Sequence, residues 1–322
     1  MSEAITHFSP LVLSIHGSLN ADHHPAFVYL SGLARGSRRT MRNALNTMAQ
    51  MVSGGVLEAE TMNWAALRYQ HTAAIRSALA ERFAPATCNK MLAALRGVLK
   101  EAWRLGQMDA ETYHRASDLP SIKGERLPSG RALTTGELRS LFGICGRDSS
   151  PAGRRDAALL SVLYGAGLRR SEATGLDLED YDPESGALTV RQGKGRRDRT
   201  GYATNGAQDA LDAWLGTRGS EPGALFLPID KGGTVRHRRL TDQAVLIILR
   251  KRADQAGVPQ FSPHDMRRTF ISDLLDNGAD LVTVQHLAGH ASIATTARYD
   301  RRGEKAKKKA VELLHVPFVS SS

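Results

Sequence analysis

Apolar residues in the first third of the chain recur every three or four positions, the spacing that places side chains on one face of an α-helix. Ser37 precedes one such series, and we expect it to cap a helix that carries Met41, Leu45 and Met48. Residues 64–82 and 85–105 are predicted to be helical for the same reason, and no strand pattern interrupts them. We therefore expect an all-helical domain over residues 25–117, whereas residues 1–24 show no clear period and stay unassigned.

A segment rich in proline, glycine and charged residues follows over residues 118–131, a composition typical of a linker. Beyond it, Thr134 or Thr135 with Glu137 resembles a helix N-cap signature, which opens a second predicted domain over residues 132–322. Helical periodicity returns later in that domain, at residues 241–256, 265–277 and 281–288 and in a short segment after Ser292.

A strand-like stretch lies between the helices of the second domain. Residues 187–191 and 200–204 predict two strands joined by a basic turn, and a short third strand is expected at 224–227. The predicted fold is therefore mainly α with a small antiparallel β-sheet, divided into two domains.

Length and composition agree with this division. A chain of 322 residues suits about two domains, and an apolar content of 41% is ordinary for a globular protein. No apolar run approaches the ~20 residues of a membrane helix, and the first residues lack the pattern of a secretory signal. A cytoplasmic location is therefore expected. Cys88 and Cys145 lie far apart without a CxxC partner, which favours two buried thiols over a disulfide or a zinc site.

The charge balance points to a polyanionic partner. The formal net charge is +10 and the isoelectric point is about 9.8. Each lysine or arginine that meets a phosphate releases condensed counterions, so a basic surplus favours nucleic acid. Since many basic proteins bind no nucleic acid, charge alone only makes it the first partner to consider.

Five motifs in the second domain carry reactive groups, and each has an ordinary structural explanation when taken alone. In GLRRSE, Arg169 lies one helical turn before Glu172, and such a pair is most often a solvated ion pair. Lys194 lies between two glycines in the predicted hairpin, where surface turns of this composition are common. The GKG turn lacks the following Ser or Thr of a phosphate-binding loop.

The other three motifs place histidines and a tyrosine near helix ends. His264 and Arg267 are three residues apart at the start of a predicted helix and therefore share a face. His290 follows Gly289 at the end of another predicted helix, where it could simply satisfy backbone carbonyls. Tyr299 is expected about two turns into the next short helix, and by itself it is most simply an ordinary half-buried tyrosine.

Together, two arginines, one lysine, two histidines and one tyrosine suit phosphodiester transesterification without a metal ion. A phenol must lose its proton to attack phosphorus, and nearby cations favour that loss. Two guanidinium groups present forked donors to the charge that develops on the non-bridging oxygens. The leaving alkoxide needs a proton, which a lysine on a hairpin can deliver. The sequence shows no cluster of carboxylates, or of Cys and His, that suggests a two-metal nuclease.

The order and spacing of GLRRSE, GKG, HDMRRTF, LAGH and ARYD resemble the tyrosine recombinase (phage integrase) family, and most closely its Xer-like and transposon-encoded branch. The resemblance extends over nearly the whole chain, because the helical first domain is similar to the core-binding domain of that family. It implies a two-domain clamp around duplex DNA, with residues 25–117 as the core-binding domain and residues 132–322 as the catalytic domain.

The resemblance also implies a role for each matching residue. Arg169 corresponds to the first catalytic arginine and Glu172 to the acidic residue that supports it. Lys194 corresponds to the general acid, and Tyr299 to the nucleophile that forms a 3′-phosphotyrosine and frees a 5′-hydroxyl. The HxxR pair and the second histidine of the family are matched by His264, Arg267 and His290. No cofactor or metal ion is implied.

Two positions depart from the family pattern without changing a catalytic group. Arg268 stands where a histidine often follows the HxxR arginine, and Ala288 replaces a common leucine before GH. The implied activity is site-specific recombination without ATP, in which four protomers on two DNA sites exchange strands through a Holliday junction. It would serve integration, excision or resolution of a mobile element or replicon in the nucleoid, with an accessory DNA-binding protein as a further candidate partner.

The residues after the nucleophile predict one more element. Over residues 304–316, apolar side chains fall along one side of a helix, and in this family such a helix docks on a neighbouring protomer. A solvated basic tail that binds DNA without specificity is the alternative.

Two rival functions stay open at this point. A type IB topoisomerase would use similar residues to relax supercoils as a monomer, and a DNA-binding architectural protein would have lost catalysis. The basic segment past Tyr299 and the Xer-like helical domain favour recombination over the first. The complete residue set argues against the second.

Overall fold

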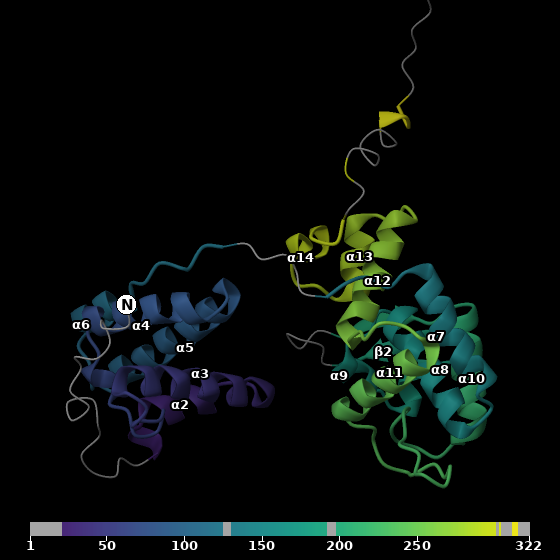
Figure 1. The fold of residues 1–322 in the computed structure, drawn as a ribbon, viewed down its shortest axis with the longest axis horizontal. Coiled ribbons are helices and arrows are strands. Elements are labelled where there is room, and N and C mark those ends of the chain that lie inside the picture. The colour runs from purple at the N-terminus through teal and green to yellow at the C-terminus, as the bar shows by residue number, and fades with distance from the viewer. Residues whose placement is uncertain (1–20, 125–129, 192–197, 301–302, 304–310, 315–322) are drawn as a thin grey trace, which may run out of the picture. The chain divides into compact units, whose positions relative to one another are not determined.

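The computed structural model describes residues 21–124, 130–191, 198–300, 303 and 311–314. The chain divides into two compact units, Met1–Pro128 and Ser129–Ser322, and each has its own hydrophobic core. Figure 1 draws the first unit in purple to blue and the second in teal to yellow. Within the described residues, no helix is long and apolar enough to cross a membrane.

The first unit is built of helices around α5. Its elements are α2 (Pro25–Ser31), α3 (Arg35–Ser53), α4 (Tyr69–Arg82), α5 (Pro85–Arg104) and α6 (Ala110–Ser117), with 3₁₀ turns at Ala21–His23 and Trp64–Ala66. α5 packs against α2, α3, α4 and α6, and its apolar stripe is buried at Cys88, Leu92, Leu95 and Leu99. The helix predicted over residues 85–105 from its apolar spacing is therefore confirmed, and its apolar face lies in this core. Both cysteines of the chain are buried free thiols, as predicted.

Two helix boundaries in this unit differ from the predicted ones. α3 begins directly after Ala34, because the Ser37 amide donates to the Ala34 carbonyl (2.8 Å) and so belongs to the first turn. Ser37 is therefore not the cap. The helix predicted over 64–82 is interrupted at Arg68, whose extended backbone caps α4 while its amide donates to His71 Nδ1 (2.9 Å).

The segment predicted as a linker is tied down near both ends. Asn89 exchanges two hydrogen bonds with the backbone of Ile122 (2.8 and 3.0 Å), which holds the start of the segment on the helical unit. The Arg131 amide donates to Asp265 Oδ1 (3.0 Å), which holds its end on the second unit. Residues 125–129 lie outside the described residues.

The second unit combines helices with a small sheet. Its helices are α7 (Thr135–Arg147), α8 (Pro151–Tyr164), α9 (Arg170–Gly175), α10 (Gly206–Arg218), α11 (Asp242–Ala256), α12 (Pro263–Asp276), α13 (Leu281–Ala288) and α14 (Ile293–Ala297), with a 3₁₀ turn at Leu178–Asp180. α7 begins with the predicted signature, since Thr134 and Glu137 form a capping box. α8 lies at the centre of the core and packs against α7, α9, α10 and α12.

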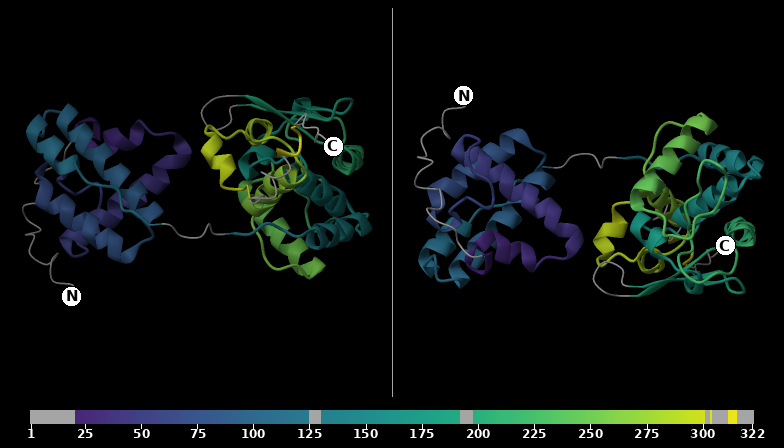
Figure 2. Two further views of the ribbon diagram at one scale, coloured as in Figure 1. Left: turned by 90° about the horizontal axis from the view of Figure 1, so that it is seen from above. Right: turned by 90° about the horizontal axis from the view of Figure 1, so that it is seen from below.

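The sheet of this unit has the order β1-β2-β3 among the described residues, with β1 at Tyr181–Asp182, β2 at Ala187–Val190 and β3 at Arg199–Tyr202. Both pairs are antiparallel, as predicted, and Val190 faces Arg199 where the hairpin opens. The third strand predicted at 224–227 is wrong. This apolar run is buried in the core, with Ala224 in an isolated bridge to Asp177, and β1 takes the third place in the sheet. Figure 2 shows the teal strands on the opposite side of the unit from α11, drawn in green.

A buried ionic cluster joins three helices of the second unit. Arg252 on α11 is 1% exposed and donates to Asp156 Oδ2 on α8 (2.8 Å) and to Asp148 Oδ2 at the end of α7 (2.8 Å). Asp156 also accepts from its neighbour Arg155 (2.7 Å). The cluster therefore holds α7, α8 and α11 together, and α9 and α12 pack against α8 and α11.

We expect Arg252→Met to destabilise the protein by about 3 kcal/mol, the low end of the loss for breaking a buried ion pair, because the substitution removes one of the two buried guanidinium groups that pair with Asp156 and leaves only Arg155. The free energy of unfolding, measured by urea titration of the full chain, would report the loss. Arg236→Met is the matched control, since Arg236 forms its ion pair with Asp230 at 59% exposure, where a pair contributes at most about 1 kcal/mol. Equal effects of the two substitutions would contradict the role given to Arg252.

Candidate active site

The site is assembled on the C-terminal end of α13. Successive carbonyls there accept from three arginines that come from different elements: Arg199 Nη1 donates to Leu287 O (2.7 Å), Arg267 Nη2 to Ala288 O, and Arg169 Nη2 to Gly289 O (2.9 Å). The last carbonyls of a helix have no partner within it and carry the negative end of its dipole. The end of α13 therefore attracts cations and holds them in a fixed order.

Gly289 makes this approach possible. It ends α13 in the left-handed conformation (φ 58°), which favours glycine. A Cβ atom at this position would lie 2.6 Å from Arg199 Cδ, so a side chain would displace the guanidinium. His290 follows directly and is held by its Nδ1 contact with Thr296 Oγ1 (2.9 Å).

Glu172 holds Arg169 from the opposite side. Arg169 is the N-cap of α9, its amide donates to Glu172 Oε2 (2.8 Å), and its Nη1 lies 2.5 Å from Oε1. The predicted ion pair between these residues is confirmed. Burial by itself raises the pKa of Glu172, but Arg199 and Arg169 outweigh it, so the pKa of this carboxyl lies below its usual value. Glu172 is therefore a buried anion between two guanidinium groups.

α12 carries two of the predicted site residues. Its start is set by Pro263 in the first turn and by a capping box between Ser262 and Asp265. Arg267 is 2% exposed, and besides the α13 carbonyl it donates from Nη1 to Gly167 O. Burial and the nearby charge of Arg169 lower the pKa of Arg267 to about 9, which leaves the group charged at neutral pH. Arg267 thus links the segment before Arg169 to the end of α13.

Tyr299 lies beside His264, but it does not lie within a helix as predicted. α14 ends at Ala297, and Tyr299 belongs to the turn that follows, where its amide donates to Thr296 O (2.9 Å). The phenol oxygen is 3.4 Å from His264 Nε2. The ring stacks on that of His290 with centroids 6.1 Å apart, and Arg268 Cζ lies 5.7 Å from the tyrosine centroid. The short helix ends too early to contain the tyrosine, but the turn still brings it to the site.

Both histidines are held in a cationic environment. Burial lowers the pKa of His264, and the charges of Arg268 and Arg267 lower it further. Burial, followed by the charges of Arg267 and Arg169, lowers the pKa of His290 to about 4. Both imidazoles are therefore neutral at pH 7.

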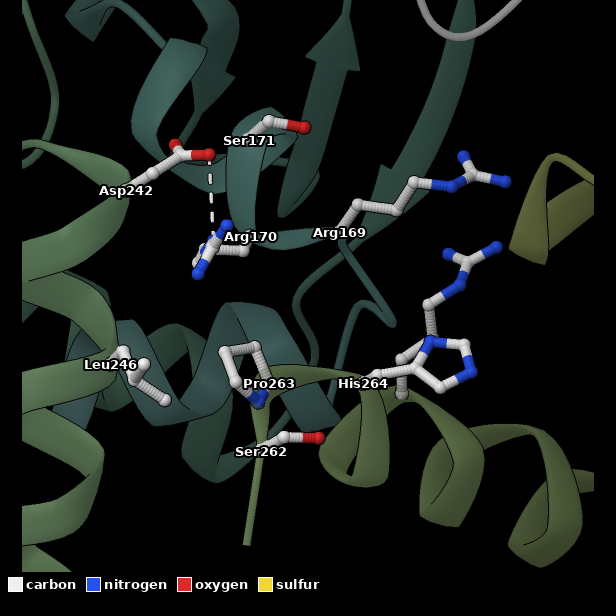
Figure 3. Close-up of a pocket in the computed structure, with 9 residues that line it drawn as sticks. Arg169, Arg170, Ser171, Asp242, Leu246, Ser262, Pro263 and His264 are labelled. Atoms are coloured by element: carbon white, nitrogen blue, oxygen red, sulfur yellow. Dashed lines mark ion pairs between the residues drawn. The ribbon is translucent and has the colours of Figure 1, made fainter. Parts of the chain in front are cut away.

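A pocket of about 450 Å³ opens beside these groups. It is lined by Arg169, Arg170, Ser171, Asp242, Leu246, Ser262, Pro263, His264 and Arg267. Figure 3 shows the side chains of Arg169 and His264 extending in the same direction, while Arg170 faces Asp242 with a 3.4 Å ion pair. Arg169 and His264 therefore offer hydrogen-bond donors to an anion on one side of the pocket. On the other side, the charge of Arg170 is paired with Asp242.

The structure brings together six of the seven residues singled out in the sequence: Arg169, Glu172, His264, Arg267, His290 and Tyr299. Lys194 lies outside the described residues. Arg199 was missed, because one arginine at the end of the basic run between the two hairpin strands carries no distinguishing local signal. Among the described residues, no group of His, Cys, Asp and Glu side chains could hold a metal ion.

Comparison with known proteins supplies the wider context. The pattern of the phage integrase family matches residues 131–305. The chain is 38% identical over 240 residues to tyrosine recombinase XerC of Pseudomonas aeruginosa, which covers 68% of this chain and 74% of that protein. It is 33% identical over 280 residues to tyrosine recombinase XerC of Herpetosiphon aurantiacus, which covers 83% of this chain and 86% of that protein.

The fold is also that of solved DNA recombinases. The integrase of transposon Tn1549 in complex with a circular intermediate DNA superposes with a TM-score of 0.66 at 16% identity, over 92% of this chain and 100% of that one. Fold and family pattern thus define a protein of the integrase type. The chain belongs to the phage integrase family of tyrosine recombinases, which confirms the family and the mainly helical fold expected from its motifs.

The pKa of His290 provides a test of the assembled site. We expect an NMR titration to give about 4 for this imidazole rather than the usual 6.5. Between these two values the unfolded chain binds more protons than the folded one, so the free energy of unfolding should fall as the pH falls from 6.5 to 4. Arg169→Gln should raise the pKa of His290 by removing a neighbouring cation, whereas Arg191→Gln, outside the site, should not change it. A value near 6.5 in the unmodified protein would mean that the cluster does not assemble in solution.

Proposed function

We propose that the protein is a site-specific recombinase that cleaves and rejoins DNA strands through a covalent bond to Tyr299. The observation that carries this proposal is the approach of Tyr299 Oη to His264 Nε2 (3.4 Å) beside two arginines at the rim of one pocket. In the reaction, Oη attacks the scissile phosphorus and the bond to the 5′-oxygen breaks. The products are a 3′-phosphotyrosine and a 5′-hydroxyl.

Arg169 and Arg267 would bind the non-bridging phosphate oxygens. A guanidinium group has five N–H donors, so each arginine retains donors beyond those used on the α13 carbonyls. Their charges oppose the negative charge that grows on these oxygens in the transition state. Because backbone and Glu172 contacts hold both groups in place before DNA arrives, little reorganisation is needed when the phosphate binds.

The two histidines would handle protons and hydrogen bonds at the same phosphate. A neutral imidazole can accept a proton at an unprotonated nitrogen, and His264 Nε2 is the nitrogen next to the phenol. We assign His264 to the transfer of the Tyr299 proton. His290, neutral for the same physical reason, would bind a phosphate oxygen through Nε2, since Nδ1 is engaged by Thr296.

Lys194 is the proposed general acid for the leaving 5′-oxygen. This assignment rests on its place in the GKG motif between β2 and β3, since the residue itself lies outside the described part of the chain. The phosphotyrosyl bond conserves the energy of the broken phosphodiester, so rejoining needs neither ATP nor a metal ion.

The wider reaction is proposed from the family resemblance. The Tn1549 integrase has been solved with a circular intermediate DNA, which supports DNA as the partner of this chain, and we propose duplex DNA. We propose residues 25–117 as the core-binding domain and residues 132–322 as the catalytic domain, joined by the linker at 118–131. Four protomers would exchange strands through a Holliday junction, with the helix at 304–316, largely outside the described residues, docking on a neighbour. An accessory DNA-binding protein and a place in the nucleoid belong to the same proposal.

Tyr299→Phe should abolish the covalent adduct because the attacking atom is removed, while DNA affinity stays within a few fold. Nicked duplexes drawn from the DNA beside the gene would trap the adduct, and denaturing gel electrophoresis would detect it. Tyr202→Phe is the control, since Tyr202 is an exposed tyrosine on β3. Adducts that persist in the Tyr299 variant would show another nucleophile, and relaxation of any plasmid without a specific site would favour a topoisomerase instead.

Lys194→Ala should slow cleavage by about 10²–10⁴-fold, the usual contribution of general acid catalysis. A substrate with sulfur at the 5′-bridging position has a leaving group that needs no proton, so it should recover most of that rate. Lys231→Ala changes an exposed lysine in another loop and should leave both rates unchanged. Equal defects of Lys194→Ala on the oxygen and sulfur substrates would remove the lysine from this role.

A further inference from the structure

Arg199 connects three segments of the site. It is the first residue of β3, and its side chain is 10% exposed. Its Nη2 lies 2.6 Å from Glu172 Oε2 on α9, and its Nη1 donates to Leu287 O on α13 (2.7 Å). A single guanidinium group thus joins strand β3 to the two helices that carry Glu172 and lead to His290.

The surroundings of Arg199 show that the site is built closely around it. Its Nε is buried and has no hydrogen-bond partner among the described residues. A buried donor without a partner destabilises the folded protein, so the other contacts of Arg199 must outweigh this loss. The side chain also occupies the space beside Gly289, where a Cβ atom would come within 2.6 Å of Arg199 Cδ. The absence of a side chain at Gly289 therefore provides the space that Arg199 fills.

The charge of Arg199 acts on Glu172. After burial, which raises the pKa of this carboxyl, the charge of Arg199 is the largest single cause and lowers it; Arg169 lowers it further through its charge and its hydrogen bonds. Glu172 in turn accepts both from the Arg169 amide and from its Nη1. Because the carboxylate is only 7% exposed, it depends on these two cations to remain ionised.

We propose that Arg199 is a positioning residue of the strand-transfer site. It sets Glu172 and the end of α13, and through them it orients Arg169 and His290 without touching DNA. The planar guanidinium directs one nitrogen to the Glu172 carboxylate and another to the Leu287 carbonyl. A lysine ammonium is a compact group and cannot make both contacts equally well. This inference rests on the proposed function, and no motif in the sequence assigns a role to this residue.

Three variants of the full chain test the proposal. Arg199→Met should slow covalent adduct formation by about 10²-fold, the loss expected when a catalytic group is displaced by about 1 Å, with DNA affinity unchanged within a few fold. Arg199→Lys should recover part of the rate because it keeps the charge. Arg191→Met is the matched control on the other side of the hairpin turn, directly after β2, where Arg191 pairs with Asp180 outside the site, and it should react at the normal rate.

The substrate with a 5′-bridging sulfur separates this role from an effect on Lys194. If Arg199 orients Arg169, the Arg199→Met defect should persist on the sulfur substrate, whereas the Lys194→Ala defect should largely disappear. Recovery of Arg199→Met on the sulfur substrate would overturn the proposal, because the arginine would then act through the hairpin lysine.

Amide hydrogen exchange gives a readout that needs no DNA. In Arg199→Met, the amides of Arg169 and His290 should exchange faster, since they donate to Glu172 Oε2 and to Gln285 O in segments that Arg199 anchors. The same amides should be unchanged in Arg191→Met. Unchanged exchange in Arg199→Met would overturn the inference, whereas a wild-type protein with no adduct on any duplex would instead refute the proposed function.

Discussion

The end of α13 is the feature on which the candidate site in the second unit depends. Within the part of the chain that the structure describes, three guanidinium groups converge on the carbonyls of Leu287, Ala288 and Gly289. Like charges this close would repel one another strongly in a partly buried setting. Two sources of negative potential offset that repulsion, the dipole at the helix terminus and the buried carboxylate of Glu172. A phosphate that enters the pocket therefore meets cations that are already placed.

The same concentration of charge accounts for the state of the histidines. Protonation of His264 or His290 would add a further cation to a buried cluster, so burial and the arginines together hold their pKa values down. A neutral imidazole next to the Tyr299 phenol can accept a proton, which a charged one cannot. The arginines thus contribute twice to the proposed reaction, by binding the phosphate and by keeping the neighbouring base in its reactive form.

Precision at this site comes from packing that lies further away. α12 is buried along most of its length, and α8 and α11 are joined by the Arg252 cluster. Thr174 on α9 donates to Asp242 Oδ1 at the start of α11 (2.7 Å), which fixes the helix that carries Glu172. Side chains on rigid elements hold a productive geometry better than side chains on loops. The tyrosine is the exception, because it lies in a turn just after a five-residue helix.

The sequence by itself determined those features that depend on neighbours a few residues apart. The stripe along α5, the capping box of Thr134 with Glu137 and the ion pair of Arg169 with Glu172 all follow from helical spacing. Predictions failed where packing against distant parts of the chain outweighs the local pattern. The apolar run at 224–227 is buried in the core instead of forming a strand, and α14 stops before Tyr299.

Only the tertiary structure decided what surrounds each reactive group. Arg199 meets Glu172 across 27 residues and Leu287 across 88, and no local pattern specifies partners at such separations. The order of the motifs resembles a known family, and this resemblance alone indicates which residues would carry chemistry. The convergence of the arginines on one helix end, and the pKa values that result, arise from packing and burial that exist only once the chain has folded.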